Sequence, residues 1–239
     1  GPSPAQPARP TEDERLLERV EDLRTIRKDA WRIFRIMGEF VEGFEEMSQI
    51  GPAVSVFGSA RTGPDDPMYG ACVETTRRLG KAGFAIITGG GPGIMEAANQ
   101  GARLAGARSI GCNIELPFEQ RTNAFLDVSI DFRYFFVRKT MFVKYAEAFV
   151  IFPGGFGTLD ELFEALTLIQ TNKVHDFPVI LFGSSYWSGL IEWIERTMVA
   201  EGKIDRRDLA LVYVTDDPAE ATDHIVRCHR EREARLHSP

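Results

Sequence analysis

Two short segments of the chain combine residue types that could do chemistry. The first is PGGFGTLDE, residues 153–161, in which a glycine-rich turn precedes the adjacent carboxylates Asp160 and Glu161. Glycines after a strand bring backbone N–H groups close to an anion, and the following helix N-terminus adds a partial positive charge. The glycine part is therefore expected to hold a phosphate. The expected phosphate-binding residues are Gly154, Gly155, Phe156, Gly157 and Thr158.

A carboxylate beside such a loop is unexpected, because a second negative charge next to a phosphate is unfavourable. It is explained if Glu161 faces a cation. Loss of a base from ribose passes through an oxocarbenium-like state, which a carboxylate can stabilise while it activates the attacking water. The structural alternative is a capping box, because Thr158 and Glu161 have its three-residue spacing. The sequence leaves both interpretations open.

The second segment is RYFFVRKTMF, residues 133–142, which reads as a helix carrying a cation within an apolar stripe. Arg138 shares one helical face with large apolar residues, among them Phe135 and Phe142. A structural arginine would pack its stem there and pair or solvate its head. The functional alternative is a clamp on phosphate or ribose, with Lys139 as a neighbouring point charge.

A further glycine loop occurs in ITGGGPGIM, which contains Gly89, Gly90 and Gly91. It fits a phosphate-binding turn, although a tight connection without a ligand has the same form. The GxGxxG pattern fails at Ile94, and no GxxxxGK[ST] is present, which disfavours a nicotinamide cofactor or ATP hydrolysis. Ser59, at the end of FGSA, could donate to a phosphate or cap the next turn.

These segments must be positioned by a sheet, and the sequence predicts one. Short apolar runs alternate with helical patterns, which predicts an α/β fold with a mainly parallel, doubly wound Rossmann-like sheet of about seven strands. In such sheets the ligand binds at the carboxyl ends of the strands, where the glycine loops would meet. The predicted strand runs cover residues 53–58, 84–91, 107–114, 127–132, 147–155, 177–183 and 209–215.

Three segments are expected along the chain. Residues 1–10 are Pro-rich and read as a flexible tail, and residues 11–50 show apolar residues at helical spacing and form an N-terminal helical extension. Residues 51–239 form the Rossmann-like nucleotide-binding catalytic domain. The apolar positions of the extension could serve assembly or pack onto the chain's own core.

Composition excludes several classes of protein. A net charge of −7 over 239 residues disfavours nucleic acid as a partner, and no apolar run is long enough for a transmembrane helix. Three separated cysteines and four histidines without HExxH spacing suggest neither disulfides nor a metal site. We therefore expect a cytoplasmic protein without a metal or membrane partner.

Taken together, ITGGGPGIMEAAN, IELPFEQ, FRYFFVRKTMF and PGGFGTLDELFEALTLIQ resemble the LOG (Lonely Guy) family of cytokinin-activating phosphoribohydrolases. The resemblance spans residues 53–214 and includes the specific combination of PGGxGTxxE with an upstream Arg-Lys pair. Members of this family were often labelled lysine decarboxylases. This chain shows no pyridoxal-phosphate signature that would support that label.

The resemblance implies hydrolysis of N6-modified adenosine 5′-monophosphates, or of AMP, to free base and ribose 5-phosphate without a cofactor. By position, Arg138 and Glu161 match the catalytic pair of the family. Glu119 and Thr167 resemble substrate-contacting positions. Asp160 stands where the family commonly has Glu, which leaves Asp160 only a supporting role.

The resemblance also implies a homo-oligomer, either a dimer or a dimer-based hexamer, because the N-terminal helices and IELPFEQ are similar to the longer subgroup of the family. Two other functions remain open. One is a broader 5′-monophosphate nucleosidase. The other is a non-catalytic molybdenum-cofactor carrier, which shares the glycine loops but should lack the GTxxE acid present here.

Overall fold

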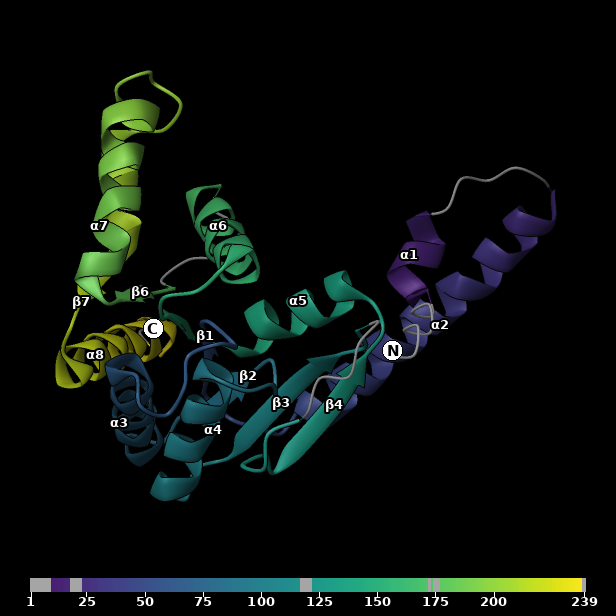
Figure 1. Ribbon diagram of the computed structural model, residues 1–239, viewed down its shortest axis with the longest axis horizontal. Helices are drawn as coiled ribbons and strands as arrows, with labels where there is room; N and C mark the ends of the chain where they lie inside the picture. Colours follow the sequence, from purple (N-terminus) through teal and green to yellow (C-terminus); the bar gives the residue numbers. More distant parts are fainter. Residues whose placement is uncertain (1–9, 18–22, 117–121, 172, 174–176, 238–239) are drawn as a thin grey trace, which may run out of the picture.

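The protein has one sheet of seven parallel strands in the order β4-β3-β2-β1-β5-β6-β7 (Figure 1). This computed structural model describes residues 10–17, 23–116, 122–171, 173 and 177–237. Each of the seven predicted apolar runs contains one strand, which confirms the predicted fold class. The strands are β1 (Ala53–Phe57), β2 (Ala85–Thr88), β3 (Ser109–Ile114), β4 (Val128–Phe132), β5 (Ala148–Ile151), β6 (Val179–Phe182) and β7 (Val212–Thr215).

Burial explains why the central strands read as continuous apolar runs. Every residue of β1, β2, β5 and β6 is buried. A parallel sheet is covered on both faces, so both sets of alternating side chains must be apolar. The edge strand β4 instead alternates between buried and more exposed residues. The strands that end at the expected site thus lie in the middle of the core.

Helices cover the two faces of the sheet and divide the core into two clusters. One cluster unites Val54 of β1 with side chains of α3 (Pro67–Lys81), α4 (Ile94–Ala105) and α8 (Pro218–Leu236). The other unites Phe57 of β1 with side chains of α5 (Phe135–Tyr145), α6 (Phe156–Gln170) and α7 (Ser184–Trp193). A π-helical turn, Ile194–Val199, and a 3-10 turn, Arg206–Leu211, follow α7.

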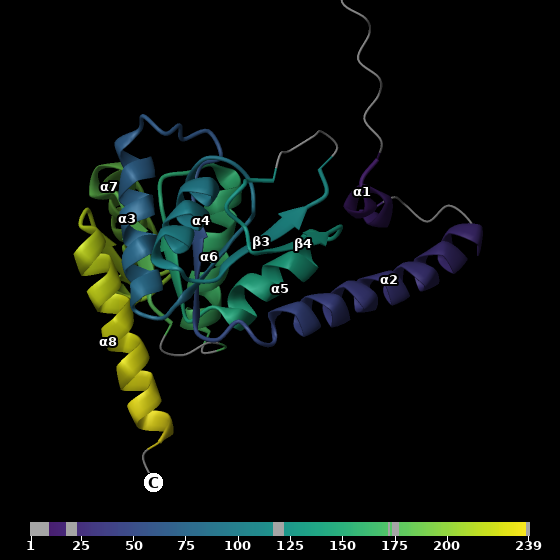
Figure 2. The same ribbon diagram turned by 90° about the horizontal axis from the view of Figure 1, so that it is seen from below.

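The N-terminal helices are α1 (Glu12–Leu17) and α2 (Leu23–Met47). The end of α2 packs on the body, because Met47 belongs to the core and a Cβ at Gly43 would lie only 2.8 Å from Met141 Cε of α5. The other end of α2 extends beyond the sheet (Figure 2) and exposes Trp31 and Phe34. The second half of α2 therefore packs onto the chain's own core.

The strand order defines where a ligand-binding crevice belongs. From β1 the chain builds outward through β2, β3 and β4, and it then returns to place β5 on the other side of β1. Between β1 and β5 the connections leave toward opposite sides, which opens a crevice at the carboxyl ends of these strands. Ser59 follows β1 and Pro153 follows β5, and the amide of Ser59 donates to the Pro153 carbonyl over 2.9 Å.

The contact between α3 and α4 depends on a glycine. A Cβ at Gly101 would lie 2.0 Å from Thr76 Oγ1 and 2.3 Å from the Val73 carbonyl oxygen. We expect Gly101→Ala to lower the free energy of unfolding by about 1–3 kcal/mol, because the two helices must separate. Urea denaturation measures this.

Gly38→Ala is the matched control, because a Cβ at Gly38 in α2 meets open space. It should leave stability unchanged or raise it by roughly 0.5–1 kcal/mol through helix propensity. Equal destabilisation by both substitutions would contradict the packing argument.

Candidate active site

A cleft of about 590 Å³ lies at the carboxyl ends of the central strands. This volume is in the range of small-molecule sites. Loops after β1, β2 and β5 and the helices α4, α5 and α6 supply its walls. The lining residues are Phe57, Gly58, Ser59, Ala60, Arg61, Gly89, Met95, Arg138, Phe142, Gly155, Phe156, Gly157, Thr158 and Glu161.

Arg138 enters this cleft from the first turns of α5. Its guanidinium carbon lies 5.3 Å from the ring centroids of both Phe135 and Phe142, so the predicted apolar stripe is the wall against which it packs. Burial lowers the pKa of Arg138, and the nearby charge of Glu161 opposes this effect. Arg138 is thus a desolvated cation held at the cleft wall.

Glu161 enters from the second turn of α6 and is only 4% exposed. The helix begins at Phe156 with Gly155 as its N-cap, and no side chain makes a capping hydrogen bond. The capping-box interpretation is therefore wrong, because Thr158 already lies inside the helix and Glu161 lies beyond its first turn. Burial raises the pKa of Glu161 to about 7, although Lys139 and Arg138 lower it.

Arg138 and Glu161 share a further property. Among the residues that the structure describes, two buried side-chain polar atoms have no hydrogen-bond partner, Arg138 Nε and Glu161 Oε2. Buried polar groups are nearly always paired, and an unpaired one costs free energy of folding. Two such atoms on the walls of one cleft mark it as a site whose polar groups are directed at something other than the protein.

Lys139 points toward the acidic side chains of α6, Glu161 among them. Its Nζ lies 2.7 Å from Asp160 Oδ2, 2.5 Å from Glu164 Oε2 and 3.7 Å from Glu161 Oε1. Lys139 therefore binds carboxylates of the protein and tunes the charge of Glu161, whereas the sequence suggested a ligand contact. Asp160 is exposed and pairs with Lys139, and its supporting role stays a prediction.

The N-terminus of α6 forms one end of the cleft. A Cβ at Gly154 would lie 2.1 Å from Thr158 Oγ1, so glycine is needed for the turn to fold back on the helix. The first turn of a helix has N–H groups without intrahelical acceptors, which attract anions. Phe156 is 92% exposed at the rim. Ser59 faces the same cleft, and its Oγ accepts from the Arg61 amide, so both alternatives raised for Ser59 are compatible with the structure.

The loop of Gly89, Gly90 and Gly91 separates this cleft from a second one of about 440 Å³, and Gly89 lines both. Gly90 has a φ of +72°, and a Cβ there would lie 1.8 Å from Asn113 Oδ1. The Gly90 amide donates to Thr88 Oγ1 over 2.9 Å. That amide is therefore engaged by the protein, and Gly89 is the residue of this loop that faces Arg138.

A buried asparagine fixes the shape of this loop. Asn99 is fully buried, accepts from the Thr88 hydroxyl over 2.6 Å and donates to Ser109 Oγ over 2.9 Å. Asn123 donates both to Asn99 Oδ1 and to the Gly91 carbonyl. Because a satisfied buried network is rigid, the glycine loop is tied to β2, β3 and α4 at once.

The structure does not bring every predicted residue to the cleft. Thr167 lies further along α6, donates to the Phe163 carbonyl and lines an apolar groove beside the turns after α7. Glu119 lies outside the described residues, so its predicted role stays a prediction. Conversely, the sequence interpretation missed Arg61, a cation at the cleft two residues after Ser59, and the anchoring network of Asn99.

Two features are absent from the described residues. No group of three or more His, Cys, Asp or Glu side chains that could hold a metal ion occurs in that part of the chain. In the same ranges, no helix combines the length and apolar character needed to cross a membrane.

Comparison with known proteins places this chain in a family. Residues 95–225, more than half of the chain, match the family described as "Possible lysine decarboxylase". The cytokinin riboside 5′-monophosphate phosphoribohydrolase LOG3 of Arabidopsis thaliana is 30% identical over 157 residues, which are 63% of this chain and 71% of LOG3. The chain belongs to the LOG family. Probable LOG6 of the same plant is 28% identical over 155 residues, or 64% and 76% of the two chains.

Solved structures share the LOG-family fold. The structural genomics target TM1055 is 27% identical with a TM-score of 0.56, and the match covers 74% of this chain and 99% of the target. The molybdenum cofactor carrier protein of Chlamydomonas reinhardtii is 23% identical with a TM-score of 0.54, over 75% and 98% of the two chains. The second likeness shows a common fold alone.

The raised pKa of Glu161 predicts a pH-dependent effect on stability. Its folded-state pKa of about 7 exceeds the ordinary 4.5, so the neutral form is favoured by folding. That contribution is fully present below pH 4.5 and is lost as the pH rises through 7. Burying the ionised form then costs about 3 kcal/mol.

We therefore expect Glu161→Gln to raise the melting temperature by several degrees at pH 8.5 and to leave it nearly unchanged at pH 4.5. Thermal unfolding followed by circular dichroism measures this. The exposed Glu192→Gln, on α7, should change neither value. A pH-independent effect of Glu161→Gln would mean that Glu161 titrates normally.

Proposed function

We propose that the protein hydrolyses the N-glycosidic bond of adenosine 5′-monophosphates, including N6-modified ones, to free base and ribose 5-phosphate. The observation that carries the proposal is the pair of buried, unpartnered polar atoms, Arg138 Nε and Glu161 Oε2, on one cleft. LOG-family relatives named for this activity support it. The arrangement of charge in the cleft gives the reaction a physical basis.

The phosphate end of the substrate would bind at the α6 N-terminus. The amides of the first turn and the partial positive charge of the helix suit a dianion, and Arg61 adds a cation at the same cleft. The hydroxyl of Ser59 accepts from the Arg61 amide, so its hydrogen remains able to donate to a phosphate oxygen. These contacts fix the sugar relative to Glu161.

Glu161 would act on the sugar. As the C1′–N bond breaks, positive charge develops at C1′, and an ionised carboxylate nearby stabilises it. Water adds its oxygen to C1′ with Glu161 as general base, and the proton passes to the departing base. A pKa of about 7 suits this exchange of protons at neutral pH. Arg138, half-buried at the same cleft as Glu161, would bind ribose or phosphate oxygens and favour the ionised carboxylate.

The test is to incubate the protein with AMP and with isopentenyladenosine 5′-monophosphate and to follow free base by chromatography. We expect release of base from both, and we expect Glu161→Gln to lower kcat by roughly 10³-fold or more while AMP affinity measured by calorimetry changes little. Glu192→Gln, which removes an exposed carboxylate, is the control.

Absence of base release from every purine monophosphate would overturn the proposal. Similar kcat/KM values for AMP, GMP and CMP would instead identify a broader 5′-monophosphate nucleosidase. Tight binding of molybdenum cofactor without hydrolysis would identify a carrier. If Glu161→Gln kept its activity, Glu161 would have a structural role and not a catalytic one.

We also propose that the protein forms a homo-oligomer. The support is an exposed apolar face of α2, where Trp31, Phe34, Met37 and Val41 recur at helical spacing. Apolar patches of this kind are typical of interaction surfaces. We expect more than one subunit in solution by light scattering, and a smaller species for Phe34→Glu. A monomeric wild-type protein would contradict this proposal and leave the hydrolase proposal untouched.

A further inference from the structure

The helix that carries Arg138 lacks an N-terminal cap of its own. Its N-cap position is Tyr134, which makes no side-chain capping hydrogen bond, and its first turn contains no acidic residue. The first N–H groups of a helix have no intrahelical acceptors, and their partial positive charge is unfavourable beside a half-buried cation. In α5 that cation is Arg138, one turn into the helix. The missing acceptors must come from elsewhere in the fold.

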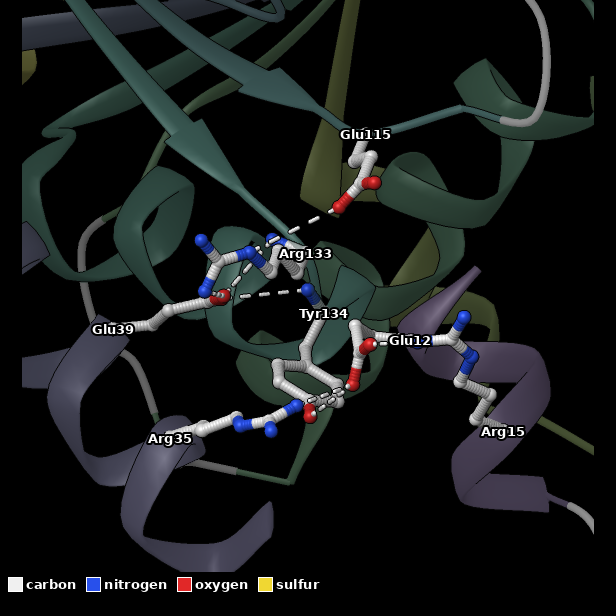
Figure 3. Close-up of polar contacts among 7 residues, drawn as sticks. All are labelled: Glu12, Arg15, Arg35, Glu39, Glu115, Arg133 and Tyr134. Atoms are coloured by element: carbon white, nitrogen blue, oxygen red, sulfur yellow. Dashed lines mark hydrogen bonds and ion pairs between the residues drawn. The ribbon is translucent and has the colours of Figure 1, made fainter. Parts of the chain in front are cut away.

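They come from the N-terminal helices. Glu39 of α2 is buried, and its carboxylate accepts from the Arg133 amide over 3.1 and 3.2 Å and from the Tyr134 amide over 3.4 Å (Figure 3). Asp13 of α1 accepts from the Phe135 amide over 3.2 Å. Three successive backbone donors are thus bound by two carboxylates distant in the sequence.

A second contact holds the same corner. The hydroxyl of the buried Tyr134 donates to Glu12 over 3.4 Å, and Glu12 also pairs with Arg15 and Arg35 (Figure 3). Figure 3 shows Glu39 of α2 at the backbone amide of Tyr134 and Glu12 of α1 at its hydroxyl group. The N-terminal helices therefore determine where α5 begins.

This corner is connected to the candidate active site through one residue. The Tyr134 amide is bound by Glu39, and the Tyr134 carbonyl accepts from the Arg138 amide over 3.3 Å. Any movement of Tyr134 shifts the first turns of α5 and with them the Arg138 guanidinium. The close approach of α2 at Gly43 to Met141 holds the two helices together at a second point.

We propose that Glu39 is a positioning residue for Arg138, and that α1 and α2 together form a cap without which α5 does not hold Arg138 at the cleft. This inference rests on the proposed function of Arg138. It assigns the N-terminal extension a role within each subunit, separate from any role of its exposed apolar face in assembly.

The primary test compares Glu39→Gln with Glu46→Gln, which makes the same change of charge at an exposed position of the same helix. In Glu39→Gln the new amide N–H₂ group faces backbone donors. We expect kcat/KM for AMP to fall roughly 10- to 100-fold, the range for a small displacement of a catalytic group. Glu46→Gln should retain the wild-type value, and Glu39→Asp, which keeps the carboxylate, should recover part of the loss.

A double-variant cycle separates positioning from general damage. If Glu39 acts through Arg138, the double variant Glu39→Gln/Arg138→Lys should lose little beyond Arg138→Lys alone. Fully additive losses, or an unchanged kcat/KM in Glu39→Gln, would overturn the inference. If Glu39→Gln fails to fold, the same cycle is measured with Glu39→Asp.

Amide hydrogen exchange provides a readout that needs no substrate. We expect faster exchange at residues 133–138 in Glu39→Gln than in Glu46→Gln, with no change in β1 or α6. Unchanged exchange of residues 133–138 in Glu39→Gln would overturn the proposal that Glu39 caps α5, even if the variant is active. If the wild-type protein released no base, the proposed function would fail, yet the exchange experiment would still decide whether Glu39 holds α5.

Discussion

The structure depends on holding two opposite charges in a desolvated cleft without letting them neutralise each other completely. Arg138 packs against two phenyl rings, and Glu161 lies on the second turn of α6, each with one buried polar atom left unpartnered. Such an arrangement is costly, because desolvation of an ion exceeds what incomplete pairing returns. The surrounding core must supply that free energy. The fully buried central strands and the two apolar clusters on either side of them do so.

Much of this framework was predictable from local patterns. Each apolar run ending in glycine became a strand of the sheet, because a buried parallel strand must be apolar on both faces. The meeting of Ser59, Gly89 and Gly155 at one cleft follows from the strand order, since parallel strands end at the same edge. The apolar stripe around Arg138 could also be predicted from the sequence, because helical spacing alone places Phe135 and Phe142 beside it.

Other features could not be predicted, because they depend on distant residues. The spacing of Thr158 and Glu161 suggested a capping box, but the helix starts two residues before Thr158, since glycines allow the chain to turn there. From the sequence, Lys139 was predicted to contact a ligand. In the fold, Lys139 forms ion pairs with Asp160 and Glu164 of α6. The contact of Glu39 with Tyr134 carries no local sequence signal beyond the absence of a capping residue before α5. The catalytic roles of Arg138 and Glu161 stay predictions.

The pairing of β1 with β5 affects the order in which the protein folds. Val54 lies beside Ala148, so the two strands that bound the crevice are separated by three intervening strands of chain. Contacts of such long sequence separation form slowly, and a nascent chain can pair β1 with β2 before β5 has been synthesised. One wall of the cleft therefore exists before the other. A nucleotide that needs both walls would then bind only after β5 has paired with β1. Nucleotide binding would therefore indicate that the sheet is complete.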